Sequence, residues 1–457
     1  MKKICLIDYP YYFIPLAESL MNNGHEIYWI TSKKSTLKRV SKRLDKRKIL
    51  YLNTSDLVVR TNLIDIELIN NIEKISGLKL NNVILMDRIL SVRDSKKSKL
   101  FLSNSLMVII DFLKNNNIEI TLNWRDTGVQ IVANMVSQYL NIKNVIPTRI
   151  RMPDGYYGFT TQIETNSFLK IQTCSLDESR MWASTFVKDF NDYKQTPGLK
   201  FSMKSGLDIL KYLPDHLKAF TTLLIESLDD RKNQFTRYNL TEILKKYFIR
   251  RKRFFEFKLK INRIISDHKV FNKYSIFPIH TQPESSIDVQ GAFYSNQIEL
   301  VKSISRTLPT GHTLLVKIHP GDIDGQNFNF YKSMYCIPGV ELILNINNKH
   351  EFIKNAEYIF TISGSMGYEA ALLKKKVITF SNNFYNNLKN VVKCSDLENL
   401  DMLLTNSRSG TDDDIIVFLI SLRQRVVKGE PSRAYGYSPQ KLTNQDLITF
   451  NEIIELI

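Results

Sequence analysis

Three short apolar runs in the second half of the chain each end in polar residues that can do chemistry. Runs of this length, rich in Ile, Val, Leu and Phe, are typical of buried parallel strands. Ligands of open α/β sheets bind at the carboxyl ends of such strands, so we expect these polar residues to lie together. The runs are 275–279, 313–318 and 358–362, and the polar residues at their ends are Gln282, Glu284, Lys317, His319 and Ser363.

His319 and Pro320 directly follow the strand expected at 313–318. An imidazole at that position can donate a hydrogen bond to a phosphate oxygen, and Lys317 adds positive charge beside it. Pro320 stiffens the turn and removes a competing N–H group. A histidine that follows a strand can also be structural, but we expect these three residues to bind a phosphate.

The motif Ser-Gly-Ser-Met-Gly-Tyr-Glu at 363–369 follows the third run and opens a helix. Gly364 and Gly367 would let the backbone approach a ligand closely. The helix N-terminus suits a phosphate, and the hydroxyls of Ser363 and Ser365 add donors. Glu369 lies about one turn into the helix, where it can accept hydrogen bonds from a ribose or a base. The alternative is a simple N-cap with a tight turn.

Two loops in opposite halves of the chain carry the carboxylates that we consider for catalysis. Glu284 can act as an acid or base, and Gln282 can hold a sugar hydroxyl or carboxylate, unless this segment is a surface loop. Asp154 follows the expected strand 144–146 and stands in an Asp-Gly pair next to aromatic residues, where a plain turn is equally possible. Its functional interpretation is a nucleophile or base, with Arg149 and Arg151 attracting an anionic sugar.

The order of strand and helix patterns divides the chain into three parts. Residues 1–175 show alternating strands and helices, which predicts a Rossmann-like domain that would bind the acceptor. Residues 176–270 are a helical basic linker or insertion. Residues 271–457 form a nucleotide-sugar-binding Rossmann-like domain with helices at its C-terminal end. We therefore expect an α/β fold in which two such domains face a cleft, with the helical basic segment between them.

Bulk composition narrows the class of protein. The chain has 457 residues, of which 43% are hydrophobic, and a formal net charge of +17. This charge predicts attraction to a nucleotide, an acidic polysaccharide or an anionic membrane surface. No apolar run reaches the ~18 residues of a transmembrane helix, so none is expected. The four cysteines are scattered without a metal-binding spacing, which favours reduced thiols in the cytoplasm.

A strongly basic segment between Lys245 and Arg263 interleaves lysines and arginines with aromatic residues. It fits a basic amphipathic helix that lies on anionic lipid. It also fits a groove for single-stranded nucleic acid, or a solvated basic face over a core-facing aromatic stripe. No nucleic-acid-binding motif accompanies it, so no nucleic-acid partner is expected. Our expectation is an anionic inner-membrane surface as the partner.

The motifs of the second half resemble those of the bacterial capsule polysaccharide biosynthesis family. The resemblance rests on Gln282-Pro-Glu284, on Val316-Lys-Ile-His-Pro-Gly321, and on Ile362-Ser-Gly-Ser-Met-Gly-Tyr-Glu-Ala370 followed by Lys374-Lys-Lys-Val-Ile-Thr-Phe380. That family includes retaining β-Kdo transferases with a GT-B fold. The resemblance implies two Rossmann-like domains, a CMP-sugar donor and a cytoplasmic enzyme that is peripheral at the inner face of the membrane.

The first half departs from the family pattern. Kdo transferases carry an acidic pair followed by Gly-Phe, whereas this chain has Pro153-Asp-Gly-Tyr156, so that only Asp154 and Gly155 match. Glu164 is therefore a rival catalytic carboxylate. The His-Pro and serine motifs also resemble those of bacterial GT-B sialyltransferases, whose histidine and serines hold the CMP phosphate, and this role would fall to His319, Ser363 and Ser365.

Taken together, these residues predict a glycosyltransferase of capsule, O-antigen or lipopolysaccharide biosynthesis. Its donor would be CMP-Kdo or another CMP-linked acidic sugar, and its acceptor a glycan or glycolipid. The alternatives are a transferase using a UDP- or GDP-sugar, a UDP-sugar 2-epimerase-like enzyme, and a non-catalytic capsule export or scaffold protein. No cofactor and no essential metal are expected, because Asp322-Ile-Asp324 reads as a polar turn between glycines.

Overall fold

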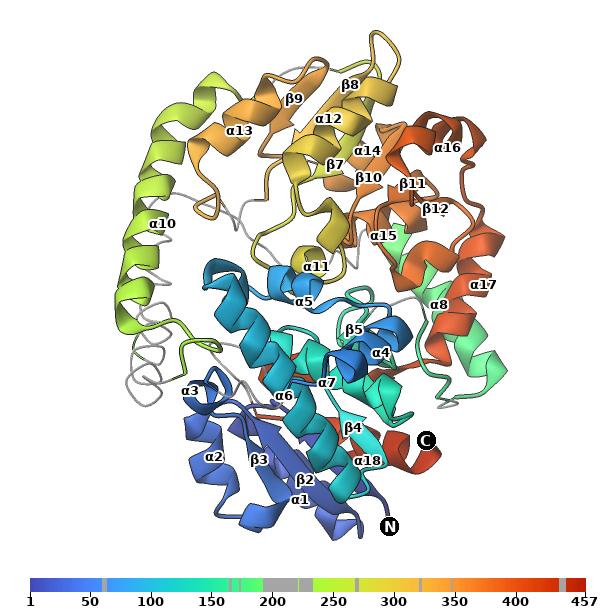
Figure 1. The fold of residues 1–457 in the computed structure, drawn as a ribbon. Helices are drawn as coiled ribbons and strands as arrows, with labels where there is room; N and C mark the ends of the chain where they lie inside the picture. Colours follow the sequence, from blue (N-terminus) through green and yellow to red (C-terminus); the bar gives the residue numbers. More distant parts are fainter. Residues whose placement is uncertain are drawn as a thin grey trace.

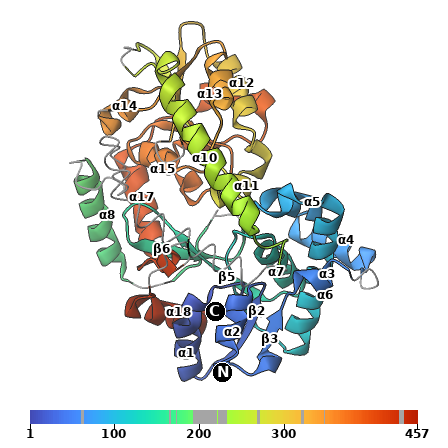
Figure 2. The same ribbon diagram turned by 90° about the vertical axis from the view of Figure 1, so that its left-hand side faces the viewer.

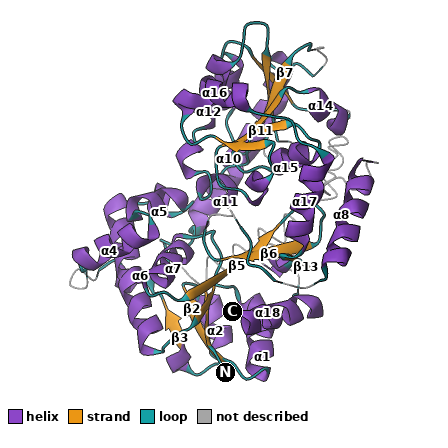
Figure 3. Ribbon diagram, turned by 90° about the vertical axis from the view of Figure 1, so that its right-hand side faces the viewer, coloured by secondary structure: helices purple, strands orange, loops and turns teal. Residues whose placement is uncertain are grey.

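Two β-sheets, one in the lower and one in the upper half of Figure 1, organise the fold. The computed structural model describes residues 1–59, 64–163, 167–171, 174–191, 221, 233–267, 271–319, 323–346, 348–434 and 441–457. Helices pack on the faces of each sheet (Figure 3). The expected α/β class with two Rossmann-like domains is confirmed.

The sheet of the first domain has seven strands in the order β13-β6-β5-β4-β1-β2-β3. The five strands from β5 to β3 are parallel, whereas β6 runs antiparallel to both β5 and β13. The strands are β1 (Lys3–Ile7), β2 (Glu26–Thr31), β3 (Ile49–Tyr51), β4 (Ile120–Leu122), β5 (Lys143–Arg149), β6 (Tyr156–Thr160) and β13 (Val426–Lys428).

Alternate side chains of the first sheet build two cores. Cys5 and Ile7 of β1 face one cluster, and Ile4 and Leu6 face the other. The first cluster is covered by α3 (Thr54–Leu57), α4 (Ile66–Ser76), α5 (Leu80–Met86), α6 (Ser95–Asn115) and α7 (Gly128–Tyr139). The second is covered by α1 (Ile14–Asn22), α2 (Lys34–Val40) and α18 (Asn444–Leu456).

The sheet of the second domain has six parallel strands in the order β12-β11-β10-β7-β8-β9. Its central strands are nearly continuous apolar runs, because both faces are covered by helices. The strands are β7 (Tyr274–Pro278), β8 (Thr313–Lys317), β9 (Val340–Ile343), β10 (Tyr358–Thr361), β11 (Lys376–Thr379) and β12 (Val391–Lys393).

Helices from three regions of the sequence cover this second sheet. One face packs against α12 (Gln297–Thr307), α13 (Phe328–Tyr335) and α16 (Leu400–Asn406). The other packs against α15 (Ser365–Leu372), α17 (Asp412–Arg423) and α8 (Leu176–Asn191), with α14 (Lys349–Asn355) beside them. A short helix, α11 (Ser285–Asp288), lies at the end of β7 and touches α5 of the first domain.

Two segments pack on a different domain from the one expected when the chain is divided into residues 1–175, 176–270 and 271–457. Residues 426–456 return to the first domain, where β13 pairs with β6 and α18 packs on α1. Phe450 of α18 lies against Phe159 of β6, with ring centroids 5.3 Å apart. Conversely, α8 of the expected linker places Phe186 and Phe190 in the core of the second domain. In both cases the segment buries its apolar side chains in a core that residues far away in the sequence form.

Helix α10 (Leu240–Lys260) runs along one side of the molecule from the first domain to the second (Figure 2). The chain leading into it is anchored in the first domain, where buried Asn233 accepts hydrogen bonds from the amide N and Oγ1 of Thr54. Its far end buries Phe257 against Tyr331 of α13. The helical basic segment expected between the domains is therefore a bridge that contacts both. Within the described parts of the chain, no helix combines the length and apolar character needed to cross a bilayer.

Candidate functional site

The carboxyl ends of β10, β7 and β8 lie side by side in the second sheet. Ser363 follows β10, the Gln282–Glu284 loop follows β7, and His319 follows β8. Since the three strands are parallel neighbours, their loops meet at one edge of the sheet. The convergence predicted from the apolar runs is thus present in the structure.

Buried His280 fixes the loop that leads into α15. The amide N of Ser363 donates a hydrogen bond to His280 Nε2 at 3.2 Å, and Ser363 Oγ donates to the carbonyl oxygen of Ser286 at 2.5 Å. Burial is the main cause that lowers the pKa of His280 to about 4, and the charge of His319 adds to it. The His280 ring is therefore neutral and accepts hydrogen bonds. Sequence reasoning missed His280, although its place two residues after β7 matches that of His319 after β8.

The two glycines of the serine motif serve packing. A Cβ on Gly364 would lie 2.9 Å from Thr361 Oγ1 and 3.1 Å from His280 Nε2. A Cβ on Gly367 would lie 2.4 Å from Thr361 Cγ2 and 3.1 Å from the Tyr385 hydroxyl. The need for glycine therefore comes from the close contact of α15 with the strand end behind it, whereas the sequence had suggested close approach to a ligand.

The N-terminus of α15 is open to solvent at this edge. Gly364 is its N-cap and supplies no side-chain cap, no acidic residue lies in the first turn, and Ser365 is exposed. The amide N of Gly364 itself donates to Thr361 Oγ1 at 3.0 Å. The first amides of the helix and the Ser365 hydroxyl are therefore oriented for an anion.

Lys317 and His319 add positive charge to the same edge. Partial burial is the main cause that lowers the pKa of Lys317 to about 8, and the charge of Lys349 adds to it. Lys317 therefore remains mostly charged at neutral pH. Partial burial, followed by the charge of Lys317, lowers the pKa of His319, which leaves its imidazole neutral at pH 7. Neutral His319 can donate one hydrogen bond to a phosphate while Lys317 supplies the charge.

Glu369 does not reach this edge. Its carboxylate is fully buried and forms ion pairs with Lys349 and with His350 Nε2, the latter at 3.2 Å. Burial by itself would raise the pKa of Glu369, but the hydrogen bonds and charges of His350 and Lys349 outweigh it and hold the pKa below its ordinary value. Glu369 therefore binds α15 to α14, which differs from the ribose or base contact expected from the sequence.

Asp154 lies in the turn between β5 and β6. Its Oδ1 accepts a hydrogen bond from Arg149 Nη2 at 2.5 Å and another from the amide N of Gly155 at 2.8 Å. Arg149 Nη1 also pairs with Glu430 Oε1 at 2.7 Å. The side chain of Asp154 is 44% exposed.

Arg151 of the first domain and Glu284 of the second lie close enough for their charges to act on each other. Arg151 has a left-handed backbone, with φ of 70°, and the charges of Glu284, Glu430 and Asp154 all act on it. Burial raises the pKa of Glu284 above its ordinary value, against the opposing charge of Arg151. The charges of Asp154 and Glu284 therefore both act on Arg151 at the junction between the two domains. That the two carboxylates work together stays a prediction.

The remaining residues of this junction were missed by the sequence analysis. Asp288 Oδ1 accepts a hydrogen bond from Gln282 Nε2 at 2.7 Å, so the Gln282 amide is partly engaged within its own loop. In the first domain Arg88 forms an ion pair with Asp126, and both charges act on Glu284. With the Gln290 amide oriented to accept, half-buried Arg125 also reaches across to the second domain. The position of residues 125–126 after β4 was the available signal.

Two of the predicted residues, Pro320 and Glu164, lie outside the described residues, and so does Asp322 of the Asp-x-Asp sequence. Among the residues that are described, no group of three or more His, Cys, Asp or Glu side chains is placed to hold a metal ion. The absence of an essential metal stays a prediction.

Residues 229–388 match the model of a family described as capsule polysaccharide biosynthesis protein. The resemblance to this family is confirmed. The matched stretch contains α10 and the strand ends that carry Glu284, His319 and Ser363. Asp154 and its two arginines lie outside the match, so the family model covers the second-domain side of the junction.

Several solved structures are similar to this chain at low identity. KpsC of Thermosulfurimonas dismutans, a β-Kdo 2,4-transferase, is 13% identical over 73% of this chain and 87% of its own, with a TM-score of 0.38. The UDP-GlcNAc 2-epimerase of Methanocaldococcus jannaschii is 12% identical over 100% of both chains, with a TM-score of 0.23. The Neisseria meningitidis UDP-GlcNAc 2-epimerase bound to UDP-GlcNAc is 13% identical over 100% of both chains, with a TM-score of 0.29. No curated protein matches the chain.

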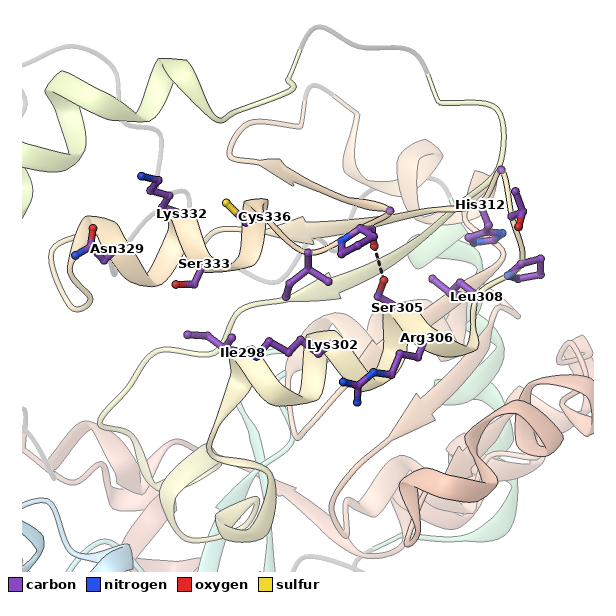
Figure 4. Close-up of a pocket in the computed structure, with 16 residues that line it drawn as sticks. Ile298, Lys302, Ser305, Arg306, Leu308, His312, Asn329, Lys332, Ser333 and Cys336 are labelled. Atoms are coloured by element: carbon purple, nitrogen blue, oxygen red, sulfur yellow. Dashed lines mark hydrogen bonds between the residues drawn. The ribbon is translucent and has the colours of Figure 1, made fainter.

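A large open groove of the second domain lies away from the junction (Figure 4). It has a volume of about 1110 Å³ and is lined by α12, α13 and the turns that precede β8 and β9. Those turns are at the amino ends of the strands, at the opposite edge of the sheet from His319. None of the residues predicted for the site lines this groove.

Proposed function

We propose that this protein is a glycosyltransferase of bacterial surface-polysaccharide assembly that uses a nucleotide-sugar donor. The observation that carries the proposal is the meeting of Lys317, His319 and the open N-terminus of α15 at one sheet edge. Such an edge suits phosphate groups. The confirmed family resemblance supports the assignment to capsule polysaccharide biosynthesis.

The donor phosphate would lie between β8 and α15. Lys317 would supply charge, His319 one hydrogen bond, and Ser365 together with the first amides of α15 the remaining donors. Ser363 serves a different purpose in this arrangement, because its hydroxyl is held by the Ser286 carbonyl. We therefore assign the phosphate contacts to Lys317, His319 and Ser365, with Ser363 as a positioning residue.

The donor sugar is proposed to be acidic and linked to CMP, as in CMP-Kdo. Arg151 and Arg88 face the junction from the first domain, where they act on the carboxylate of Glu284. A sugar carboxylate would find a cationic partner there. Arg149 is held by Asp154 and Glu430, so Arg151 is the stronger candidate for this contact.

For the chemical step we propose a double displacement. The Asp154 carboxylate would attack the anomeric carbon as the bond to the phosphate oxygen breaks, and the nucleotide would leave with that electron pair. An acceptor hydroxyl would then displace Asp154 while Glu284 takes the hydroxyl proton. A raised pKa brings Glu284 closer to neutral pH, which suits acid–base work, whereas the hydrogen bond from Arg149 would hold the Asp154 carboxylate in place.

The acceptor is proposed to be a glycan or glycolipid at the inner face of the cytoplasmic membrane, with the enzyme peripheral to that membrane on the cytoplasmic side. No metal would take part, because cationic side chains stand where the phosphate would bind. Loss of activity in EDTA with recovery in Mg²⁺ or Mn²⁺ would contradict this point.

The test measures nucleotide binding as the shift in thermal unfolding that CMP, UDP or GDP produces. A ligand at a hundred times its dissociation constant stabilises the folded state by about 2.7 kcal/mol. We expect CMP to give the largest shift, and Lys317→Ala to remove it. Lys188→Ala, on exposed Lys188 of α8, should keep it. A larger shift with UDP would favour a UDP-sugar enzyme, and no shift with any nucleotide would favour the scaffold alternative.

A further inference from the structure

One face of α10 attaches the helix to the body of the protein. Glu242 forms an ion pair with Arg93 of the first domain. Arg250 forms two hydrogen bonds with Asp324 of the second domain, at 2.6 and 3.1 Å. Phe257 is buried farther along the same face. The orientation of the helix is therefore fixed at both ends by contacts with both domains.

The opposite face of α10 presents large apolar side chains to solvent. Leu244, Phe248, Phe255 and Leu259 are 37%, 66%, 63% and 79% exposed. At about 100° per residue their spacing places them within roughly 60° of arc, as a single stripe along the helix. We call these four residues the outer stripe. Contiguous exposed apolar surface on a protein marks a site of interaction.

Basic residues border the outer stripe on both sides. Arg251 and Lys258 lie along one margin, and Lys245 and Lys252 along the other. The two carboxylates of α10 are both engaged, Glu242 with Arg93 and Glu256 with Lys260 at 2.8 Å. The outer face thus combines apolar side chains with uncompensated positive charge.

We propose that the outer stripe of α10 docks the protein onto an anionic lipid bilayer. Apolar side chains with lysines and arginines beside them match the boundary between lipid headgroups and acyl chains. The helix lies along the side of the molecule that faces the viewer in Figure 2. A second copy of the chain fits poorly, since two such faces would bring like charges together. The inference rests on the proposed location at the membrane and gives it a specific surface.

The test is flotation of the full-length protein with vesicles of phosphatidylcholine alone or mixed with phosphatidylglycerol. We expect binding to the anionic vesicles that weakens as salt rises. Phe248→Ser with Phe255→Ser should weaken it by about tenfold or more, since each ring buries apolar area. Lys245→Glu with Lys252→Glu should weaken it by at least about 30-fold, from about 1 kcal/mol per charge near the surface.

Two control variants make the same chemical changes elsewhere. Phe293→Ser removes a ring that is 90% exposed but lies outside α10. Lys74→Glu with Lys188→Glu makes the same charge change on exposed lysines of α4 and α8. Both controls should bind anionic vesicles within about twofold of the unaltered protein, because neither change touches the outer stripe.

Phe248→Trp gives a direct readout of insertion when its emission is compared with that of the unaltered protein, which has three tryptophans. Its emission should shift to shorter wavelength with anionic vesicles and be quenched by brominated acyl chains. Equal binding to neutral and anionic vesicles, or loss of binding in the controls alone, would overturn the proposal. So would an absence of binding together with a dimer that the Phe248 and Phe255 changes dissolve. Vesicle binding is read without substrate, so its failure is distinct from a failure of nucleotide binding.

Discussion

A methyl group added at Gly367 tests why the serine motif contains glycine. In the structure the Cβ of Gly367→Ala would lie 2.4 Å from Thr361 Cγ2, which forces α15 or the end of β10 to move. Overpacking of this kind costs about 1–3 kcal/mol, and the better helix propensity of alanine offsets up to about 1 kcal/mol. We therefore expect a net loss of about 1–2 kcal/mol in the free energy of unfolding.

Thr361→Ser supplies the matched background. It removes the clashing Cγ2 and keeps the Oγ that accepts a hydrogen bond from the Gly364 amide N. The next neighbour is the Tyr385 hydroxyl at 3.1 Å, which needs to shift by a few tenths of an ångström. In this background Gly367→Ala should be neutral within about 0.5 kcal/mol, so the double-mutant cycle should give a coupling of about 1–2 kcal/mol.

Urea unfolding followed by circular dichroism measures the four proteins of this cycle. With a slope of about 2–3 kcal/mol per molar, the single variant should lower the midpoint by roughly 0.5 M. CMP affinity should stay within about threefold of the unaltered protein, because the added methyl faces Thr361. Additive effects on stability would refute the packing argument, and normal stability with lost CMP binding would restore the ligand-approach interpretation.

Four further predictions concern the carboxylates and the phosphate contacts. Glu284→Gln should raise stability at pH 7. Folding raises the pKa of Glu284, so ionised Glu284 lowers the stability of the folded protein as pH rises from the ordinary pKa through the folded one. The gain from Gln should therefore vanish at acidic pH. Glu369→Gln should lower stability at pH 7 by about 3 kcal/mol, because it breaks a buried ion pair. The deficit should shrink as pH falls below about 4.3, the ordinary pKa of Glu, because the stability that comes from the lowered pKa of Glu369 is then lost. Asp154→Asn should abolish sugar transfer while CMP binding persists, whereas His319→Ala should weaken CMP binding and transfer together.

Each of these has an outcome that contradicts it. Urea midpoints measured from about pH 3 to 7 should separate the two glutamates, since the stability changes have opposite signs at neutral pH. A Glu284→Gln protein that is less stable at pH 7, or a Glu369→Gln protein as stable as the unaltered one, would contradict them. Near-normal turnover of Asp154→Asn would reduce Asp154 to a turn residue and move Glu164 forward as the catalytic carboxylate. Unchanged CMP affinity in His319→Ala would remove His319 from the phosphate site.

The sequence was informative wherever burial on both faces of the sheet leaves a local pattern. The runs that form β7, β8 and β10 are apolar because helices cover both sides, and the polar residues at their ends include His319 and Ser363. The antiparallel β5–β6 hairpin left a weaker signal, although its turn contains the predicted Asp154. Local patterns therefore located the strand ends but left the partners of each side chain undetermined.

What the sequence could not supply was the tertiary partner. Glu369 has the spacing of a ligand contact, yet Lys349 and His350 of α14 hold it inside the domain. The aromatic residues of α10 spread over about half of the helix circumference, and only the packing of α13 determines that Phe257 is buried while Phe255 is exposed. No periodicity in one segment carries information about which face a distant helix will cover.

The return of β13 and α18 to the first sheet has a consequence for folding during synthesis. Until residues 426–456 have left the ribosome, β6 lacks its outer partner strand, and Phe159 lacks its contact with Phe450. The β-strands and central helices of the second domain precede residue 426, so that domain can close its sheet first. The nascent chain therefore carries an open, apolar sheet edge through most of its translation, and the domain begun first is completed last.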